Sequence, residues 1–349
     1  MRSIFLSCVI FCQLVVVITL AQDKKEKQAV TFEELYDEPY SVNKLFIGFQ
    51  PLYGELFATN VNAGFGIEAS YYHKDKFDFK VNFRKTYSSQ FFDFNRQAAL
   101  DNKADGLTTR PSIFTYYELG GTYHIKDNDQ SGKTKMVLYK KSLRGNRWAA
   151  SVPLRAEVPC KVRKIIGARL GGIYWASSID LNHVLKAQEL TNASIIDQAG
   201  NGLPLQLPPD PISGLSKSFS VYGNMLATNA YVGGSLSWFR NVAVSFDKYE
   251  EGIDDGMLTL FFDLIYAPIL QLDPVTYQGV DYSTDAIKTT SFGFRAGIDG
   301  KFNRTLSWSY GGEIGLRPSV SGQGFYAMFK ISFPVFGTNL DYKVESFGK

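Results

Sequence analysis

The sequence has 349 residues, a formal net charge of +3 at pH 7, and 27 Phe, 20 Tyr and 31 Gly. So small a net charge gives no reason to expect a nucleic-acid partner. No stretch after the N-terminal apolar run approaches the roughly 18 uncharged apolar residues of a transmembrane helix, so a helical membrane protein is excluded.

An N-terminal targeting segment is the first predicted element. A basic residue precedes the uncharged apolar run Ile4–Leu20, and polar sequence begins directly after Ala21. We therefore predict a cleaved signal peptide at residues 1–21. The alternative is a signal anchor, which needs about 20 apolar residues. Cleavage would leave Cys160 as the one cysteine of the mature chain, so no internal disulfide is expected.

Polar residues 22–43 come next, and we interpret them as a periplasmic leader, with a plug folded into the lumen as the alternative. From Leu45 onward, apolar and polar side chains alternate with the period of two that defines a β-strand. The pattern is clear at 291–303, where one parity carries Phe292, Phe294, Ala296, Ile298 and Phe302. Tilted strands of about 9–11 residues cross a bilayer, so residues 44–336 predict a membrane barrel. A soluble all-β protein is the alternative.

Fourteen strands account for the alternating segments. They begin at Leu45 and continue at about 61–71, 77–84, 112–126, 133–140, 147–158, 161–176, 218–227, 229–240, 241–248, 256–270, 287–302, 304–317 and 322–335. The predicted fold class is all-β, a transmembrane antiparallel up-and-down β-barrel of 14 strands, with 12 as the alternative. An even count places the long connections 88–111, 177–217 and 271–286 together on the extracellular side. Residues 337–349 are either a C-terminal tail or an extension of the last strand.

The polar parity of the strands supplies the candidate functional residues, which would line the lumen. They are Glu68, Asp78, Lys80, Arg84, Glu118, His124, Arg155, Glu157, Arg163, Arg169, Asp263, Arg295, Asp299 and Glu313, with Asp247, Lys301 and Arg317 on the same parity. Charge inside a membrane barrel is tolerated where it is paired or hydrated. Because the signs are mixed, salt bridges could occlude the lumen, or a hydrated passage could have oppositely charged walls.

One window of the sequence is strongly basic. It contains Lys140, Lys141, Arg144, Arg147, Arg155, Lys161, Arg163, Lys164 and Arg169, with Glu157 as its one acid. This bias predicts an anion-attracting wall or a docking surface for lipid phosphates. The alternative is that some of these side chains pair with Glu118, Glu68 or Asp78 on neighbouring strands.

Motifs for catalysis and cofactors are lacking. The sequence contains no GxSxG, HExxH or phosphate-loop motif. Asp180 and His183 are the one close acid and histidine pair on the predicted outer side, and such pairs recur by chance. We therefore predict no enzyme activity, no metal site and no cofactor, and keep an outer-membrane hydrolase as the second alternative.

The loop 177–217 is the largest feature between predicted strands. Residues 184–197 could form a short amphipathic helix, and four prolines between 204 and 211 would keep the rest extended. Its apolar residues are Leu181, Val184, Leu185, Ile195 and Ile196. Water contact would cost these side chains free energy, so either the inner barrel wall or another envelope protein should cover them. The loop would then be a constriction or a partner-binding surface.

The Ala21-Gln22 junction, the strand sequence Phe292-Gly293-Phe294-Arg295-Ala296-Gly297 and the 14-strand count together resemble outer-membrane barrels of the Bacteroidota. The chain is most similar to the 14-stranded barrels related to fatty-acid transporters, some of which serve secretion or assembly machines as non-transporting subunits. The resemblance implies the cell outer membrane and contact with its lipid, and it carries over no functional residues. It departs at the C-terminus, where residues 337–349 follow the last aromatic side chains.

The function predicted from the sequence is that of a non-enzymatic integral outer-membrane barrel. It would be either a pore for small polar or anionic solutes or a structural subunit of an outer-membrane complex. In the second case the loop 177–217 would contact other envelope proteins. The choice depends on whether the charged lumen is open.

Overall fold

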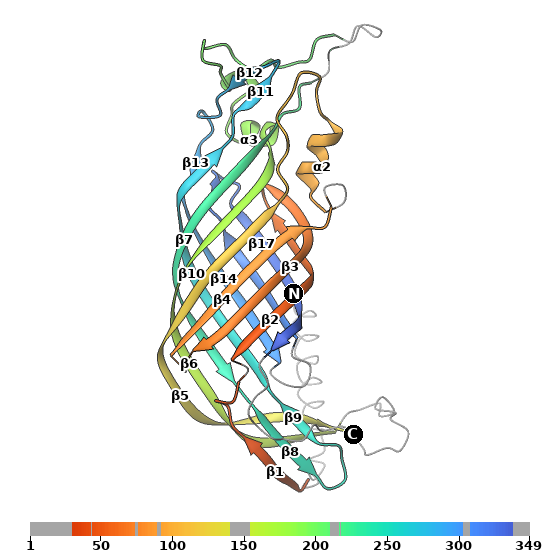
Figure 1. The fold of residues 1–349 in the computed structure, drawn as a ribbon, viewed down its shortest axis with the longest axis vertical. Helices are drawn as coiled ribbons and strands as arrows, with labels where there is room; N and C mark the ends of the chain where they lie inside the picture. The colour runs from red at the N-terminus through yellow and green to blue at the C-terminus, as the bar shows by residue number, and fades with distance from the viewer. Residues whose placement is uncertain are drawn as a thin grey trace, which may run out of the picture.

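The computed structural model describes residues 30–42, 44–73, 76–88, 92–139, 154–209, 216, 218–302 and 308–337. Ten antiparallel strands form a closed barrel in which each strand pairs with the next one along the chain, and β17 pairs with β2 to close it (Figure 1). The barrel strands are β2 (Leu45–Phe57), β3 (Asn60–His73), β4 (Phe77–Thr86), β5 (Thr115–Leu138), β6 (Leu154–Asp180), β7 (Tyr222–Phe239), β10 (Gly256–Leu272), β14 (Phe292–Phe302), β15 (Ser309–Leu316) and β17 (Phe325–Gly337).

The predicted count of 14 strands is wrong, and so is the alternative of 12. The segments 112–126 and 133–140 belong to the single strand β5, because the polar stretch 127–132 is extended and pairs with 160–165 of β6 instead of turning. In the same way the described part of 147–158, which begins at Leu154, merges with 161–176 into β6, and 218–227 and 229–240 merge into β7. The segment 241–248 forms β8 (Val242–Phe246), which lies outside the barrel. The strand count therefore no longer supports the resemblance to 14-stranded barrels.

Side chains alternate between the two faces of the barrel wall. Phe79 and Phe294 are 47% and 41% exposed on the outside, whereas Arg84 and Arg295 are each 1% exposed on the inside. The predicted parity of these strands is therefore confirmed. The outer face is apolar around the barrel, with Leu52, Ile67, Val81, Leu119, Leu170, Val232, Leu260, Phe262, Leu264, Ile314 and Phe329 all exposed. The inner face carries the charged side chains.

Strands β5 and β6 continue past the barrel as a long hairpin. The sheet of β1 (Phe32–Asp37), β8 and β9 (Gly252–Asp254) lies beside this hairpin (Figure 1). The core between them consists of Met136, Leu138, Ala156, Val158, Cys160, Val242, Val244 and Phe246. A register shift between His124 and Lys126 precedes this region. On β6, the side of the strand that is exposed at Leu170 is covered at Val158, so one face changes from an outer surface to a core.

The core between the hairpin and this sheet explains two features of the sequence, which are part of the predicted leader and the buried Cys160. Part of the predicted leader 22–43 is the strand β1, whose Asp37 side chain accepts a hydrogen bond from the Lys161 amide at 2.7 Å. Cys160 is buried there, and burial raises the pKa of its thiol above the usual value. The cysteine is a small apolar core residue.

The long connections lie together at the other end of the barrel (Figure 1). They contain α2 (Phe94–Asp101), α3 (Leu181–Ala187), the 3₁₀ helix η1 (Asn192–Ser194), the pair β11 (Val275–Tyr277) and β12 (Val280–Tyr282), and β13 (Thr289–Thr290), which pairs with β16 (Ser319–Val320). Within the described segments, no helix is long and apolar enough to span a membrane.

Some predicted features fall outside the described residues. The signal peptide 1–21 lies within 1–29, most of the C-terminal segment lies within 338–349, and the basic residues between 140 and 147 lie within 140–153.

We predict that Phe246→Ala will loosen the hairpin core without opening the barrel. Phe246 is fully buried, so its truncation should cost about 3–5 kcal/mol. Hydrogen exchange should accelerate at the amides of β1 and β8 and stay unchanged in β14 and β15. Leu154→Ala is the control, because Leu154 is 54% exposed on the same hairpin. Equal exchange in both variants would contradict the separate core.

Candidate functional site

The lumen holds a layer of paired charges at whose centre is Arg295 on β14. Its Nη2 donates to Glu118 Oε1 of β5 at 2.6 Å, its Nε to Asp263 Oδ2 of β10 at 2.8 Å, and its Nη1 to Glu313 Oε2 of β15 at 3.4 Å. The guanidinium carbon lies 4.4 Å from the centre of the Tyr231 ring. Strands β14 and β5 are four neighbours apart around the barrel. One side chain therefore connects opposite walls of the lumen.

Two further arginines extend this layer. Arg317 makes a bidentate pair with Glu55 of β2 at 3.0 and 2.9 Å. Arg84 of β4 lies 3.6 Å from Glu313 and stacks 3.9 Å over the ring of Tyr116. Aromatic faces stabilise guanidinium groups in this geometry.

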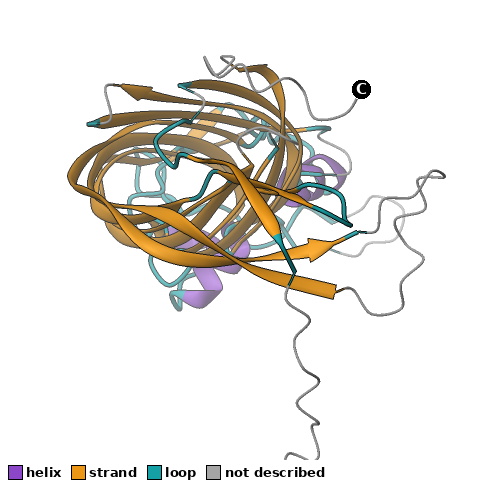
Figure 2. Cartoon of the chain, turned by 90° about the horizontal axis from the view of Figure 1, so that it is seen from below, coloured by secondary structure: helices purple, strands orange, loops and turns teal. Residues whose placement is uncertain are grey.

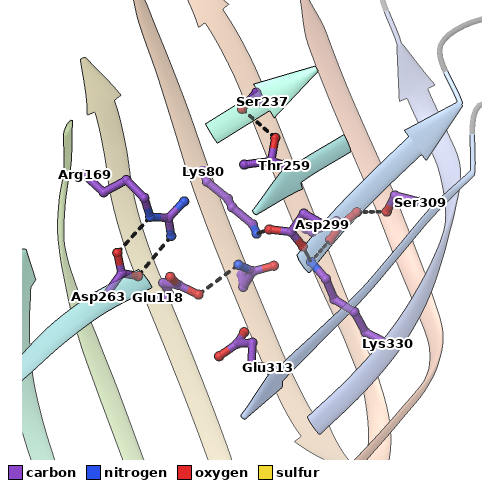
Figure 3. A network of polar contacts seen from close by, with 12 residues as sticks. Lys80, Glu118, Arg169, Ser237, Thr259, Asp263, Asp299, Ser309, Glu313 and Lys330 are labelled. Carbon is purple, nitrogen blue, oxygen red and sulfur yellow. Dashed lines mark hydrogen bonds and ion pairs between the residues drawn. The ribbon is translucent and has the colours of Figure 1, made fainter. Parts of the chain in front are cut away.

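The fourth arginine completes the charge balance. Arg169 of β6 donates to both oxygens of Asp263, at 2.9 and 3.2 Å (Figure 3). We call the group of Arg84, Arg169, Arg295, Arg317, Glu55, Glu118, Asp263 and Glu313 the charged layer, and each member is at most 9% exposed. Four guanidinium groups face four carboxylates. Compensation of this kind is what makes buried charge tolerable.

A second cluster of charges lies beside the charged layer. Lys330 of β17 donates to Glu68 at 2.5 Å and lies 3.3 Å from Asp299, which also pairs with Lys80 (Figure 3). Ser309 donates to the other oxygen of Glu68. His124 Nε2 lies 3.1 Å from Asp78 Oδ2. We call this set the lysine cluster.

An apolar core fills the lumen at the end where the long loops lie. It joins strand residues such as Trp175, Ile179 and Met225 to loop residues such as Leu107 and Phe219. The loop residues Leu181, Val184, Leu185 and Ile195 belong to it and are at most 1% exposed, so the prediction that they are covered is confirmed. The barrel does not cover Ile196, which is 46% exposed, so coverage of this residue by a partner stays a prediction.

The opposite mouth is narrowed by the chain that leads into β2. Val42 packs with Ile165, Phe239 and Met257 from three barrel strands. Figure 2 looks toward this end and shows loop segments lying across the opening. The charged layer is thus bounded by apolar side chains at both ends of the lumen.

The structure places most of the predicted lumen residues on the inner face. Those inside are Glu68, Asp78, Lys80, Arg84, Glu118, His124, Arg169, Asp263, Arg295, Asp299 and Glu313. Arg163 is fully buried at the start of the hairpin and donates to both oxygens of Asp127, at 2.8 and 2.5 Å. The prediction that Arg155 and Glu157 line the lumen is wrong. Both are exposed on the hairpin, because β6 has already left the barrel there.

The described part of the basic window does not form a wall of the lumen. Its residues from 155 to 164 belong to the hairpin, and among its described residues Arg169 alone reaches the charged layer. For the described residues of this window, the alternative of pairing with Glu118, Glu68 or Asp78 is wrong, since the partners of those acids there are Arg295, Lys330 and His124. Asp247 also lies outside the barrel, after β8.

The prediction did not include Glu55, Lys330 and the tyrosines that contact the arginines. Lys330 carries a signal that could have been used, because it lies on the polar parity between Met328 and Ser332 in an otherwise apolar strand. Glu55 has the same signal in β2. Tyr116 gives no such signal, because the sequence does not distinguish an inward-facing tyrosine from any other aromatic residue of a strand.

The Asp180 and His183 pair has a structural role. Asp180 Oδ1 accepts a hydrogen bond from the His183 backbone amide at 3.2 Å and caps α3. Across the described ranges, no group of three or more His, Cys, Asp or Glu side chains is arranged to hold a metal ion.

No protein-family model matches the sequence. No curated protein matches it either. Two solved structures are similar to this chain at low scores. The high-pH structure of OprB from Pseudomonas putida has a TM-score of 0.18 and 11% identity, over 78% of this chain and 59% of that one. The CymD monoaromatic hydrocarbon channel has a TM-score of 0.21 and 8% identity, over 85% and 88%.

The chain spans less than two thirds of the length of OprB. At these TM-scores neither likeness bears on function. The class of this protein therefore follows from its own structure, which is an all-β antiparallel barrel.

We predict that Arg317→Met will destabilise the fold strongly. The change leaves the buried Glu55 carboxylate with a distant Arg84, at 4.0 Å, and a hydrogen bond from Asn62, which should cost about 3–5 kcal/mol. The measurement is the free energy of unfolding in denaturant. The double variant Glu55→Met, Arg317→Met should recover much of the loss, because it removes both buried charges. The control is Arg240→Met, whose ion pair with Asp254 is 42% exposed on the arginine side and should contribute less than about 1 kcal/mol. If Arg317→Met and Arg240→Met lowered the free energy of unfolding by similar amounts, breaking a buried ion pair of the charged layer would cost no more than breaking an exposed one. That result would contradict the prediction.

Proposed function

We propose that this protein is an integral outer-membrane β-barrel. The proposal is supported by the outer face of the barrel, where large apolar side chains follow one another across neighbouring strands. Phe294 pairs with Leu264 on one side and Leu316 on the other, and all three are 41–56% exposed. Exposed apolar patches beyond a few hundred Å² are rare on soluble monomers. Lipid is the environment that makes such a face favourable.

We infer the orientation from connection lengths. Bacterial barrels have long extracellular loops and keep their termini in the periplasm. In this orientation the end with α2, α3 and the β11–β12 pair is extracellular, and the hairpin with β1, β8 and β9 is periplasmic. A signal peptide at 1–21 agrees with export to the outer membrane.

Within that membrane, we propose a structural role for a barrel whose lumen is closed to solutes. The observation that carries the proposal is the position of Arg295, which is 1% exposed and contacts carboxylates of three other strands. A passage along the axis would have to break these ion pairs, and breaking a buried ion pair costs several kcal/mol. A scaffold needs no such passage.

The surfaces that a scaffold would offer to envelope proteins lie at the two ends. In the loop 177–217 most apolar residues face the barrel, which leaves Ile196 and Leu205 as its large exposed apolar side chains among the described residues, at 46% and 58%. The periplasmic sheet presents Phe32 and Leu35, at 37% and 40%. We expect a non-enzymatic role, since the Asp180 side chain caps α3 through the His183 backbone amide.

A gated pore for small polar or anionic solutes is the second candidate. It is supported by a cavity of about 90 Å³ in the lysine cluster, which lies next to the periplasmic apolar group of Val42 and Met257. Conduction would require both the loop core and the charged layer to rearrange.

We predict that Phe294→Arg will impair insertion. An arginine on the lipid face costs about 2–4 kcal/mol near the bilayer midplane. The folded fraction in liposomes, read from heat-modifiable mobility on a gel, should fall. Leu35→Arg is the matched control, because Leu35 is similarly exposed but lies on β1 outside the barrel. A mature chain that stays monomeric in water without detergent would overturn the membrane proposal.

We predict that the wild-type protein will show no single-channel conductance in a planar bilayer. Replacing 182–209 with a short Gly-Ser linker should leave it silent, because the charged layer still seals the lumen. Adding Glu118→Ala and Arg295→Ala to that replacement should produce conductance. Steady conductance by the wild type would favour the pore and refute the scaffold.

A further inference from the structure

The lumen contains a cavity lined by charged, hydroxyl and apolar side chains, with four Lys or Arg residues against three Asp or Glu residues. Its volume is about 90 Å³. The lining includes the charged residues Glu68, Asp78, Lys80, Arg169, Asp299, Lys301 and Lys330, and the hydroxyl residues Ser70, Thr122, Ser235, Thr259 and Ser309. Figure 3 shows the side chains of Lys80, Asp299, Ser309 and Lys330 pointing toward one another from neighbouring parts of the barrel wall.

Every carboxylate of this lining has a partner. Glu68 accepts hydrogen bonds from Lys330, Ser309 and, at 3.2 Å, Gln50. Asp299 pairs with Lys80 and Lys330, and Asp78 lies within hydrogen-bond distance of His124. Glu68 and Asp299 are therefore compensated by lysines, whereas Asp78 has a hydrogen-bond partner in His124, which carries a charge only when it is protonated.

Lys301 differs from the other cations of the lining. Lys80, Lys330 and Arg169 each contact a carboxylate, whereas the buried Nζ of Lys301 has no hydrogen-bond partner among the described residues. It lies 3.7 Å from the centre of the Phe46 ring. An aromatic face stabilises an ammonium group but satisfies none of its three N–H donors. A buried ammonium group in this state is strongly stabilised by an anion.

We propose that this cavity binds a small oxyanion, a free carboxylate or phosphate of a few heavy atoms, with Lys301 as its counter-ion. The hydroxyls of Thr122 and Ser235 line the same space and can donate to further oxygens. The site goes beyond a closed structural barrel, because it gives the lumen a ligand. It also does not depend on the membrane role, since the cavity belongs to the barrel itself.

The size of the cavity limits the ligand. A volume of about 90 Å³ on this measure holds several water-sized groups, since about 10–15 Å³ suffices for one water molecule. Acetate and inorganic phosphate fall in this range. A phospholipid head group with its glycerol and acyl chains does not.

The test is isothermal titration of the full mature protein in detergent with sodium phosphate and sodium acetate, against sodium chloride at equal ionic strength. We expect saturable binding of at least one oxyanion at one site per chain. Lys301→Met should weaken that binding at least tenfold, because the thioether keeps the length of the side chain and removes the charge. The matched control is Lys164→Met, a lysine that pairs with Asn128 in register on the hairpin and lies outside the cavity. Its affinity should equal that of the wild type.

Three results would overturn the proposal. They are the absence of saturable binding to the wild type, equal binding by the Lys301 and Lys164 variants, and displacement of the signal by phosphatidylglycerol micelles with no response to free phosphate or acetate. If Lys301→Met fails to fold, Lys301→Gln takes its place with the same expectation. The wild-type titration decides the existence of the site without any variant. Conductance and insertion measurements are independent of this result, so the site and the membrane role can fail separately.

Discussion

Charge compensation inside the barrel is the constraint on which the rest of this structure depends. The alternation of a β-strand assigns apolar side chains to one face, so everything polar must share the other. Ten strands enclose a space narrow enough for Arg295 to reach carboxylates on three other strands. Each guanidinium group that enters this space needs a carboxylate from elsewhere in the chain. The aromatic rings of Tyr116 and Tyr231 then fill the remaining gaps.

The barrel class and the inward or outward direction of many residues could be predicted from the sequence, because they depend on a local period of two. Phe79 and Arg84 show this, since they lie five residues apart in one strand and face opposite sides. The strand count could not be predicted in the same way. The polar stretch 127–132 looks like a turn, yet it is extended, because beyond the barrel both faces of a strand can carry polar residues. Sequence alternation does not report where a strand leaves the barrel.

The ion-pair partners of the charged residues also could not be predicted from the sequence. Arg295 and Glu118 are 177 residues apart, and Arg317 and Glu55 are 262 apart. Their contact depends on the number of strands and their stagger, which together fix the two residues that meet across the lumen. With 14 strands the walls would stand farther apart and the same arginines could not bridge them. The error in strand count and the uncertainty between pore and closed lumen therefore have one origin.

The pairing of β2 with β17 has a consequence for how the chain reaches its final state. Glu55 and Arg317 come from the two ends of the barrel sequence, so their ion pair requires those ends to have approached each other. Before that moment a half-formed sheet would present unpaired carboxylates and guanidinium groups along its concave side. Such a sheet is unstable in hydrocarbon, because burying an unpaired charge there costs free energy. Seam formation and neutralisation of the interior are thus one cooperative event, and partly assembled intermediates are disfavoured by the same side chains that seal the finished lumen.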